Sequence, residues 1–175
     1  GGMYYGARWP LQVGDGWKIT EKVRLSRPAS LSLGKDGRLQ YVALETIPGL
    51  LVELTPDGPK TVFGDFGEPD GLLAQDNAVL VSEADPDGRV MAYNVDTARL
   101  RVLARMDRPE GLLRRADGSV VVAQSVSEGR LWLLREGAEP EVLVEGLSSP
   151  KGLCTLPDGR IGIADSGTGR ILAHG

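Results

Sequence analysis

The chain has 175 residues, a formal net charge of −4, 41% hydrophobic residues, 24 glycines and 11 prolines. This is enough apolar material for one core, and the frequent glycine and proline leave few windows in which long helices could form. Because lysine and arginine are scattered and the net charge is negative, we expect no nucleic-acid partner.

The first segment, residues 1–16, lies outside any repeat and is predicted to be an N-terminal arm, in which Gly1 and Gly2 before Met3 resemble a remnant of cloning. Residues 17–25 follow and have the character of a strand. They precede the first of four similar stretches.

A repeat of about forty residues fills the rest of the chain. Prolines recur with spacings of 41, 40 and 41 residues, and three of them begin a Pro-x-Gly-Leu sequence: Pro28, Pro69, Pro109 and Pro150. A tight-turn pair follows each proline: Asp36-Gly37, Asp76-Asn77, Asp117-Gly118 and Asp158-Gly159. Such pairs between apolar runs predict hairpins, because glycine and asparagine tolerate the positive φ of the turn.

Each copy then contains further β-rich runs separated by glycine, so that four strands fit into one repeat. Four strands per forty residues is the unit of a β-propeller, in which each sheet buries both faces against its neighbours. We therefore predict an all-β fold, a β-propeller of four four-stranded blades that forms a single domain over residues 17–175.

The two ends of the chain are predicted to complement each other. Leu25 lies three residues before its repeat proline, as Phe66, Met106 and Leu147 do, so residues 17–25 occupy the place of a fourth strand without three strands before it. The chain ends after the third strand of the last repeat. The N-terminal strand can therefore close the last blade and remove an open edge. We expect closure within a monomer, because the intramolecular strand has a high effective concentration; exchange between two chains into an eight-blade ring is the alternative.

The repeated pattern resembles NHL repeats and the gluconolactonase group of propellers, which includes senescence-marker-protein and strictosidine-synthase-like proteins. The likeness rests on Pro-x-Gly-Leu, the Asp-Gly turn, a Val-x-Val-Ala run and Gly-Arg-Val/Leu/Ile, and it is clearest over residues 69–93 and 150–172. Members of the gluconolactonase group usually have six blades, whereas this chain has four repeats.

The resemblance implies a divalent metal, usually calcium, held at one end of the channel by residues that include the one between proline and glycine. In this sequence those positions are Ala29, Asp70, Glu110 and Lys151. Asp70 and Glu110 are the candidate metal ligands, since calcium prefers oxygen donors. Lys151 supports the alternative, a rim in which a cation compensates the two carboxylates.

A second ring of polar residues is predicted where the second strands end, at Glu83, Gln124 and Asp165. These side chains could cap the following loop, with Arg89, Arg130 and Arg170 of the same repeats as partners. Together with Lys151 they could instead form a channel mouth that holds a small ligand.

No complete catalytic constellation can be assembled from the sequence. His174, the only histidine, lies next to the C-terminus, and Cys154 is predicted to be a small buried apolar residue. We therefore favour a module that binds a protein or a small ligand at a propeller face without a cofactor. The alternative is a metal-dependent lactone or ester hydrolase of the gluconolactonase type, with calcium on Asp70 and Glu110.

The chain carries no pattern of export or membrane insertion. A single cysteine forms no internal disulfide, and no run approaches eighteen apolar residues. We expect a cytoplasmic protein without a membrane partner.

Overall fold

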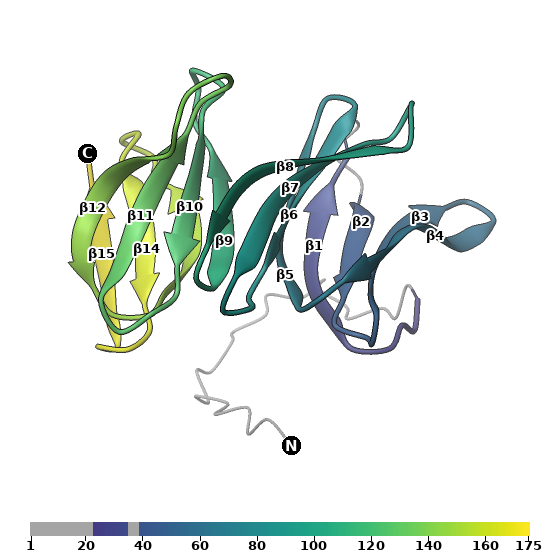
Figure 1. Cartoon of the computed structure of the whole chain (residues 1–175), viewed down its shortest axis with the longest axis horizontal. Coiled ribbons are helices and arrows are strands. Elements are labelled where there is room, and N and C mark those ends of the chain that lie inside the picture. Colours follow the sequence, from purple (N-terminus) through teal and green to yellow (C-terminus); the bar gives the residue numbers. More distant parts are fainter. Residues whose placement is uncertain (1–22, 35–38) are drawn as a thin grey trace, which may run out of the picture.

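A computed structural model describes residues 23–34 and 39–175, in which all regular structure is β-strand. Figure 1 shows four antiparallel sheets that follow one another along the chain. Blade 1 consists of β1 (Pro28–Leu33), β2 (Leu39–Leu44), β3 (Gly49–Thr55) and β4 (Gly58–Phe66), and blade 2 of β5 (Pro69–Gln75), β6 (Ala78–Glu83), β7 (Gly88–Asn94) and β8 (Arg99–Met106). Blade 3 consists of β9 (Pro109–Arg114), β10 (Val120–Gln124), β11 (Gly129–Leu134) and β12 (Glu141–Leu147), and blade 4 of β13 (Pro150–Thr155), β14 (Ile161–Asp165) and β15 (Arg170–His174).

The predicted fold class is confirmed: the chain is all-β and its sheets are arranged as the four blades of a β-propeller. Each repeat proline begins the first strand of a blade, and three blades are four-stranded meanders. The arm over residues 1–16 and most of the predicted closing strand, residues 17–25, lie outside the described residues. Within them, blade 4 has three strands, and β15 pairs with β14 alone.

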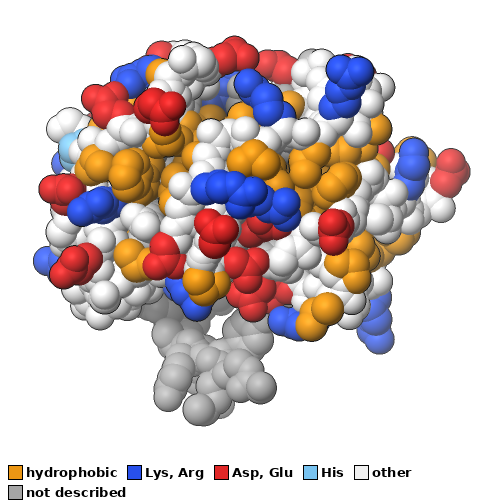
Figure 2. Space-filling model, in the orientation of Figure 1, with side chains coloured by type: hydrophobic (Ala, Val, Ile, Leu, Met, Phe, Trp, Pro, Cys, Tyr) orange, Lys and Arg blue, Asp and Glu red, His pale blue; other side chains and the backbone are white. Residues whose placement is uncertain are grey.

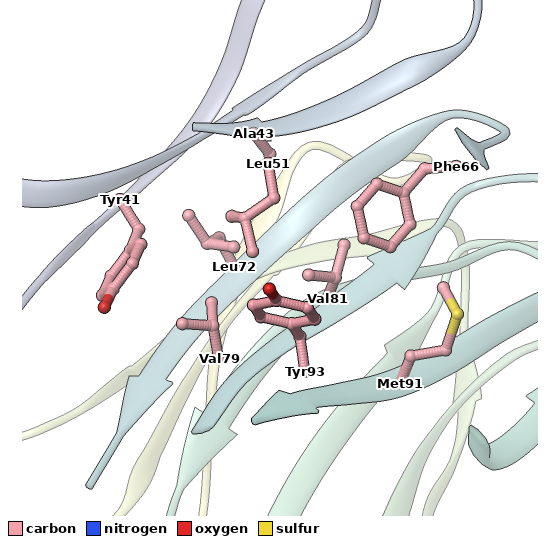
Figure 3. Packing of buried hydrophobic residues seen from close by; sticks show 9 residues of the cluster. All are labelled: Tyr41, Ala43, Leu51, Phe66, Leu72, Val79, Val81, Met91 and Tyr93. Atoms are coloured by element: carbon pink, nitrogen blue, oxygen red, sulfur yellow. The ribbon is translucent and has the colours of Figure 1, made fainter. Parts of the chain in front are cut away.

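The blades are held together by apolar clusters that lie between successive sheets. Figure 3 shows the cluster between blades 1 and 2, in which Leu51 and Phe66 of blade 1 face Leu72, Met91 and Tyr93 of blade 2. Similar clusters join blade 2 to blade 3 and blade 3 to blade 4. Because strand residues alternate between the two faces, the odd and even positions of one strand enter different clusters.

The Pro-x-Gly sequence brings the first strands of neighbouring blades close together. Gly71 lies so near the backbone of Glu110 that a Cβ atom there would overlap its carbonyl oxygen. The Ser82 hydroxyl bridges this junction, since it accepts a hydrogen bond from Gly71 N at 3.0 Å and donates one to the Glu110 carbonyl at 2.5 Å. Glycine is needed here for the close approach of two backbones.

The two ends of this series of blades do not pack on each other. β1 contacts β5, β5 contacts β9 and β9 contacts β13, but β1 and β13 are not among the strand pairs in extensive contact within the described chain. Ile171 of blade 4 and Leu31 of blade 1 are consequently 81% and 63% exposed. The prediction that Cys154 is buried is wrong: it is exposed on blade 4, because no described blade covers that face.

Candidate functional site

The predicted site residues gather at one end of the blades. Antiparallel strands place the start of the first strand beside the end of the second, and Pro69 pairs with Glu83, Pro109 with Gln124, and Pro150 with Asp165. The Pro-x-Gly positions and the second ring therefore share this face, which we call the loop face.

In the second ring, Glu83 is used inside its own blade. It is 3% exposed, and Arg89 donates two hydrogen bonds of 2.6 Å to its carboxylate. Gly67 N donates a third, at 3.0 Å. Burial opposes ionisation of Glu83, but the hydrogen bonds from Arg89 and Gly67 outweigh it and lower its pKa. Glu83 therefore fixes the entry to β5 and offers little to a ligand.

Asp165 has the same role in blade 4. It is fully buried, accepts a hydrogen bond of 2.6 Å from Ser148 N, and pairs with Arg170 at 3.1 Å. The pairing of ring residue and arginine is thus confirmed for Glu83 and Asp165. The predicted pairing of Gln124 with Arg130 is wrong.

Gln124 instead accepts a hydrogen bond from the Trp132 indole nitrogen at 2.9 Å. Arg130 pairs with Glu145 at 3.3 Å and lies over the Trp132 ring, 5.9 Å from its centre. An amide carries no charge to hold a guanidinium, and so the indole donor takes its oxygen.

On the loop face, the residues between proline and glycine of each repeat form what we call the inner rim. There, Lys151 and Glu110 form an ion pair between blades 3 and 4. The Lys151 ammonium lies 3.0 Å from Oε2 and 3.1 Å from Oε1 of Glu110, which is 7% exposed. Both residues begin a first strand, immediately after the repeat proline. The cation and the carboxylate that the sequence places at equivalent positions therefore neutralise each other.

Asp70 is the exception on this rim. It is half-buried between blades 1 and 3, and it has no hydrogen-bond or ion-pair partner among the described residues. Burial and the nearby Glu110 carboxylate raise its pKa, whereas Lys151 acts in the opposite direction. Glu45 and Glu68 add smaller repulsions. Asp70 is a carboxylate held where its charge is poorly compensated.

A hollow of about 250 Å³ lies on the loop face between blades 1 and 2. Glu45 and Glu68, which both raise the pKa of Asp70, line it together with the apolar Ile47, Pro48 and Phe66. Arg27 also lines it and pairs with Glu45 at 3.3 Å. Sequence reasoning missed this hollow, because its walls come from loops of two different repeats.

Two larger hollows, of about 420 and 530 Å³, lie at the opposite end of the blades near the Asp76–Asn77 turn. Another, of about 400 Å³, lies on the loop face beside Arg130 and Glu145. None of the predicted site residues lines them. We therefore place the candidate site on the loop face, where the uncompensated carboxylate is.

The loop face does not supply a calcium shell. Calcium takes six to eight oxygen ligands, but no group of three or more His, Cys, Asp or Glu residues is placed to hold a metal in the described part of the chain. Ala29 has no side-chain oxygen, and both oxygens of Glu110 lie against Lys151. Asp70 and Glu110 alone do not fit this ion.

Charges of both signs are interspersed with apolar side chains over the face seen in Figure 2. Residues 23–34 and 39–175 contain no helix long and apolar enough to cross a membrane.

The comparisons with known proteins agree with the repeat. A model of the NHL repeat family matches residues 147–173. No curated protein matches the chain. The fold resembles a gluconolactonase from Xanthomonas campestris, with a TM-score of 0.69, 12% identity, and coverage of 85% of this chain and 57% of the other.

Two further solved structures are similar. A streptogramin B lyase has a TM-score of 0.66 and 12% identity over 87% of this chain and 56% of its own. A candidate gluconolactonase has a TM-score of 0.62 and 17% identity over 84% of this chain and 62% of its own. The chain thus spans somewhat more than half the length of these proteins. The expected resemblance to NHL-repeat and gluconolactonase-like propellers is confirmed for the fold.

Proposed function

We propose that this chain is a binding module that receives a cationic, hydrogen-bond-donating group at Asp70 on its loop face. The group is an amine or guanidinium with a short apolar body, carried by a small molecule or by a side chain of a protein partner. The observation that carries the proposal is the isolation of Asp70. Glu83, Glu110 and Asp165 all have cationic partners, and Asp70 has none among the described residues.

The local charge supports a cationic ligand. Four carboxylates gather here, those of Asp70, Glu45, Glu68 and Glu110. Among residues 23–34 and 39–175, Arg27 pairs with Glu45 and Lys151 pairs with Glu110. A donor that reaches Asp70 would relieve the repulsion that raises its pKa. The apolar walls formed by Ile47 and Phe66 suit the body of such a ligand.

A gluconolactonase-like hydrolase is the second candidate, favoured by the structural likeness to gluconolactonases. It would require a divalent cation on Asp70, and the described residues supply too few oxygen donors for calcium. We base a cytoplasmic location on the single cysteine, which suits a reducing compartment.

A thermal-shift titration separates the two functions. The probes are methylguanidine, butylamine, a short arginine-containing peptide and calcium chloride, each compared at equal ionic strength with sodium chloride. A ligand that binds the folded form raises the melting temperature by mass action. We expect the organic cations to raise it in the wild type and not in Asp70→Asn, while Gln124→Glu keeps the response.

The opposite pattern would support the hydrolase. A shift with calcium alone that disappears in Asp70→Asn, together with calcium-dependent hydrolysis of gluconolactone, would replace the binding proposal. No shift with any of the probes would contradict both functions of Asp70.

A further inference from the structure

The outer face of blade 4 and the outer face of blade 1 repeat the two sides of an ordinary blade junction. Within the chain, three such junctions are formed. Four features recur at two or at all three of these junctions. Their two sides are exposed separately at the ends of the series, on blade 1 and on blade 4, which lie on opposite sides of Figure 1.

The first feature is apolar contact. In the third strand, the residue two places after the glycine is 0% exposed in blades 1, 2 and 3: Leu51, Val90 and Leu131. The same position in blade 4 is Ile171, which is 81% exposed. On the opposite side of a junction, Leu72 is 8% exposed, whereas its counterpart Leu31 in blade 1 is 63% exposed. Exposed apolar faces of this kind mark contact surfaces.

The second feature is the packing of a glycine on the next repeat proline. A Cβ on the glycine that starts the third strand would approach that proline to less than 3.0 Å at three junctions: Gly49 with Pro69, Gly88 with Pro109, and Gly129 with Pro150. The corresponding glycine of blade 4, Gly169, has a left-handed φ of 68° that the other three lack, and nothing lies within 4 Å of a Cβ there; Pro28 of blade 1 is exposed. Neither Gly169 nor Pro28 therefore makes this contact within the described part of the chain.

The third feature is the close approach of first strands at Pro-x-Gly. A Cβ on Gly71 would overlap the carbonyl of Glu110, and one on Gly111 would overlap that of Lys151. At Gly152 the nearest atom is the Cβ of Ala164, 3.7 Å away and in the same blade. The counterpart carbonyl in blade 1 belongs to Ala29.

The fourth feature is a backbone hydrogen bond from the residue before the proline to the loop of the preceding blade. Arg108 N donates to Asp85 O at 2.9 Å, and Ser149 N donates to Val126 O at 2.7 Å. Arg27 has the same left-handed conformation, with φ of 47° against 46° and 49° for those two donors. Neither Arg27 N nor the counterpart acceptor, Gly167 O, has a hydrogen-bond partner in the described part of the chain.

We propose that two copies of this chain join end to end, with blade 4 of each seated on blade 1 of the other in an eight-blade ring. A second copy is the occupant because it carries both complementary faces, in the same repeat register, and the faces of one copy do not meet each other. Two identical contacts related by a two-fold axis also leave no end open. This assembly goes beyond ligand binding at Asp70 and differs from the closed monomer expected from the sequence.

Light scattering on the full chain across a concentration series tests the proposal. We expect a mass of twice 18.7 kDa that falls to one chain on dilution. Ile171→Asp places a charge in the contact and should weaken association by about a hundredfold or more. Val142→Asp is the control, because Val142 is 38% exposed on β12, away from both end faces.

Two further measurements distinguish this contact from other dimers. A Cβ at Gly152 has room within one copy, so Gly152→Ala should block the pair while its circular dichroism and its melting temperature as a single copy stay close to those of the wild type. The exposed Cys154 thiol should react with a thiol reagent at full speed in the Ile171→Asp monomer and more slowly in the wild-type dimer.

Three results would overturn the proposal. One is a wild type that remains at 18.7 kDa at every concentration, which would mean that something other than a second copy covers these faces. Another is a dimer that is insensitive to both Ile171→Asp and Gly152→Ala. The third is a mass that grows steadily with concentration, since contacts that do not close produce filaments.

Discussion

Replacing Gly71 by alanine tests how the blades are joined. The new Cβ would come closer to the Glu110 carbonyl oxygen and to the Ser82 hydroxyl than the 3.0 Å that real Cβ atoms keep. To make room, blades 2 and 3 must separate, or the two hydrogen bonds of Ser82 must break. Overpacking of this kind costs about 1–3 kcal/mol, and each lost hydrogen bond about 0.5–1.5 kcal/mol.

If both effects occur, the loss in the free energy of unfolding is about 2–6 kcal/mol. For a chain of this size each kcal/mol lowers the melting temperature by about 2–4 °C, so we expect a decrease of roughly 4–24 °C. Differential scanning calorimetry and urea unfolding, performed on dilute protein, measure both quantities. The denaturant slope should remain that of the wild type, because the amount of buried surface changes little.

Gly152→Ala is the matched control, since it changes the same residue of the same Pro-x-Gly sequence. Nothing lies within 3.4 Å of a Cβ at Gly152, and its nearest neighbour is 3.7 Å away. Dilute, single-copy protein should therefore change by less than about 0.5 kcal/mol. Equal destabilisation by Gly71→Ala and Gly152→Ala would refute the reasoning, because the cost would then come from the backbone and not from the neighbouring blade.

Three other variants follow from burial and charge. Asp70→Asn should be more stable than the wild type at neutral pH and equal to it below the ordinary pKa of 3.8. The pKa of Asp70 is raised in the folded state, so its ionisation destabilises the wild type as pH rises from 3.8 through the folded-state pKa. Unfolding stability measured as a function of pH tests this. Glu83→Gln should cost about 1.5–3 kcal/mol at neutral pH, and the loss should shrink as pH falls from 4.5 through the lowered pKa, where the wild type itself loses the Arg89 pair. Leu131→Ala should cost about 2–5 kcal/mol in urea unfolding, because Leu131 is 0% exposed. Ile171→Ala should cost less than about 0.5 kcal/mol in dilute protein, because Ile171 is 81% exposed. Equal losses would contradict the burial pattern.

The fold could be predicted because the repeat carries its own structural reasons. Gly71 and Gly111 permit the approach of neighbouring first strands, and each repeat proline starts such a strand. Periodicity alone therefore placed the blades. It could not show whether the first and last blades meet, because that depends on the angle between successive sheets, and Cys154 was wrongly expected to be buried for this reason.

The candidate site could be predicted only in part. Equivalent repeat positions placed Asp70, Glu110 and Lys151 on one rim, and the pairing of Glu110 with Lys151 follows from their charges. The approach of Glu45 and Glu68 to Asp70 depends on loops of different blades, which no spacing in the sequence reveals. Gln124 was misjudged because Trp132, on the neighbouring strand, competes for its amide oxygen.

The state of the Asp70 carboxyl group is the most direct test of the proposed function. Carbon-13 NMR of labelled aspartate, assigned with Asp70→Asn, would follow this carboxyl as a function of pH, with and without methylguanidine at matched ionic strength. We predict a titration midpoint above the ordinary value of 3.8 in the free protein, which falls when methylguanidine is added. A midpoint at the ordinary value, unchanged by methylguanidine, would contradict the claim that Asp70 is an uncompensated carboxylate that receives a cationic group.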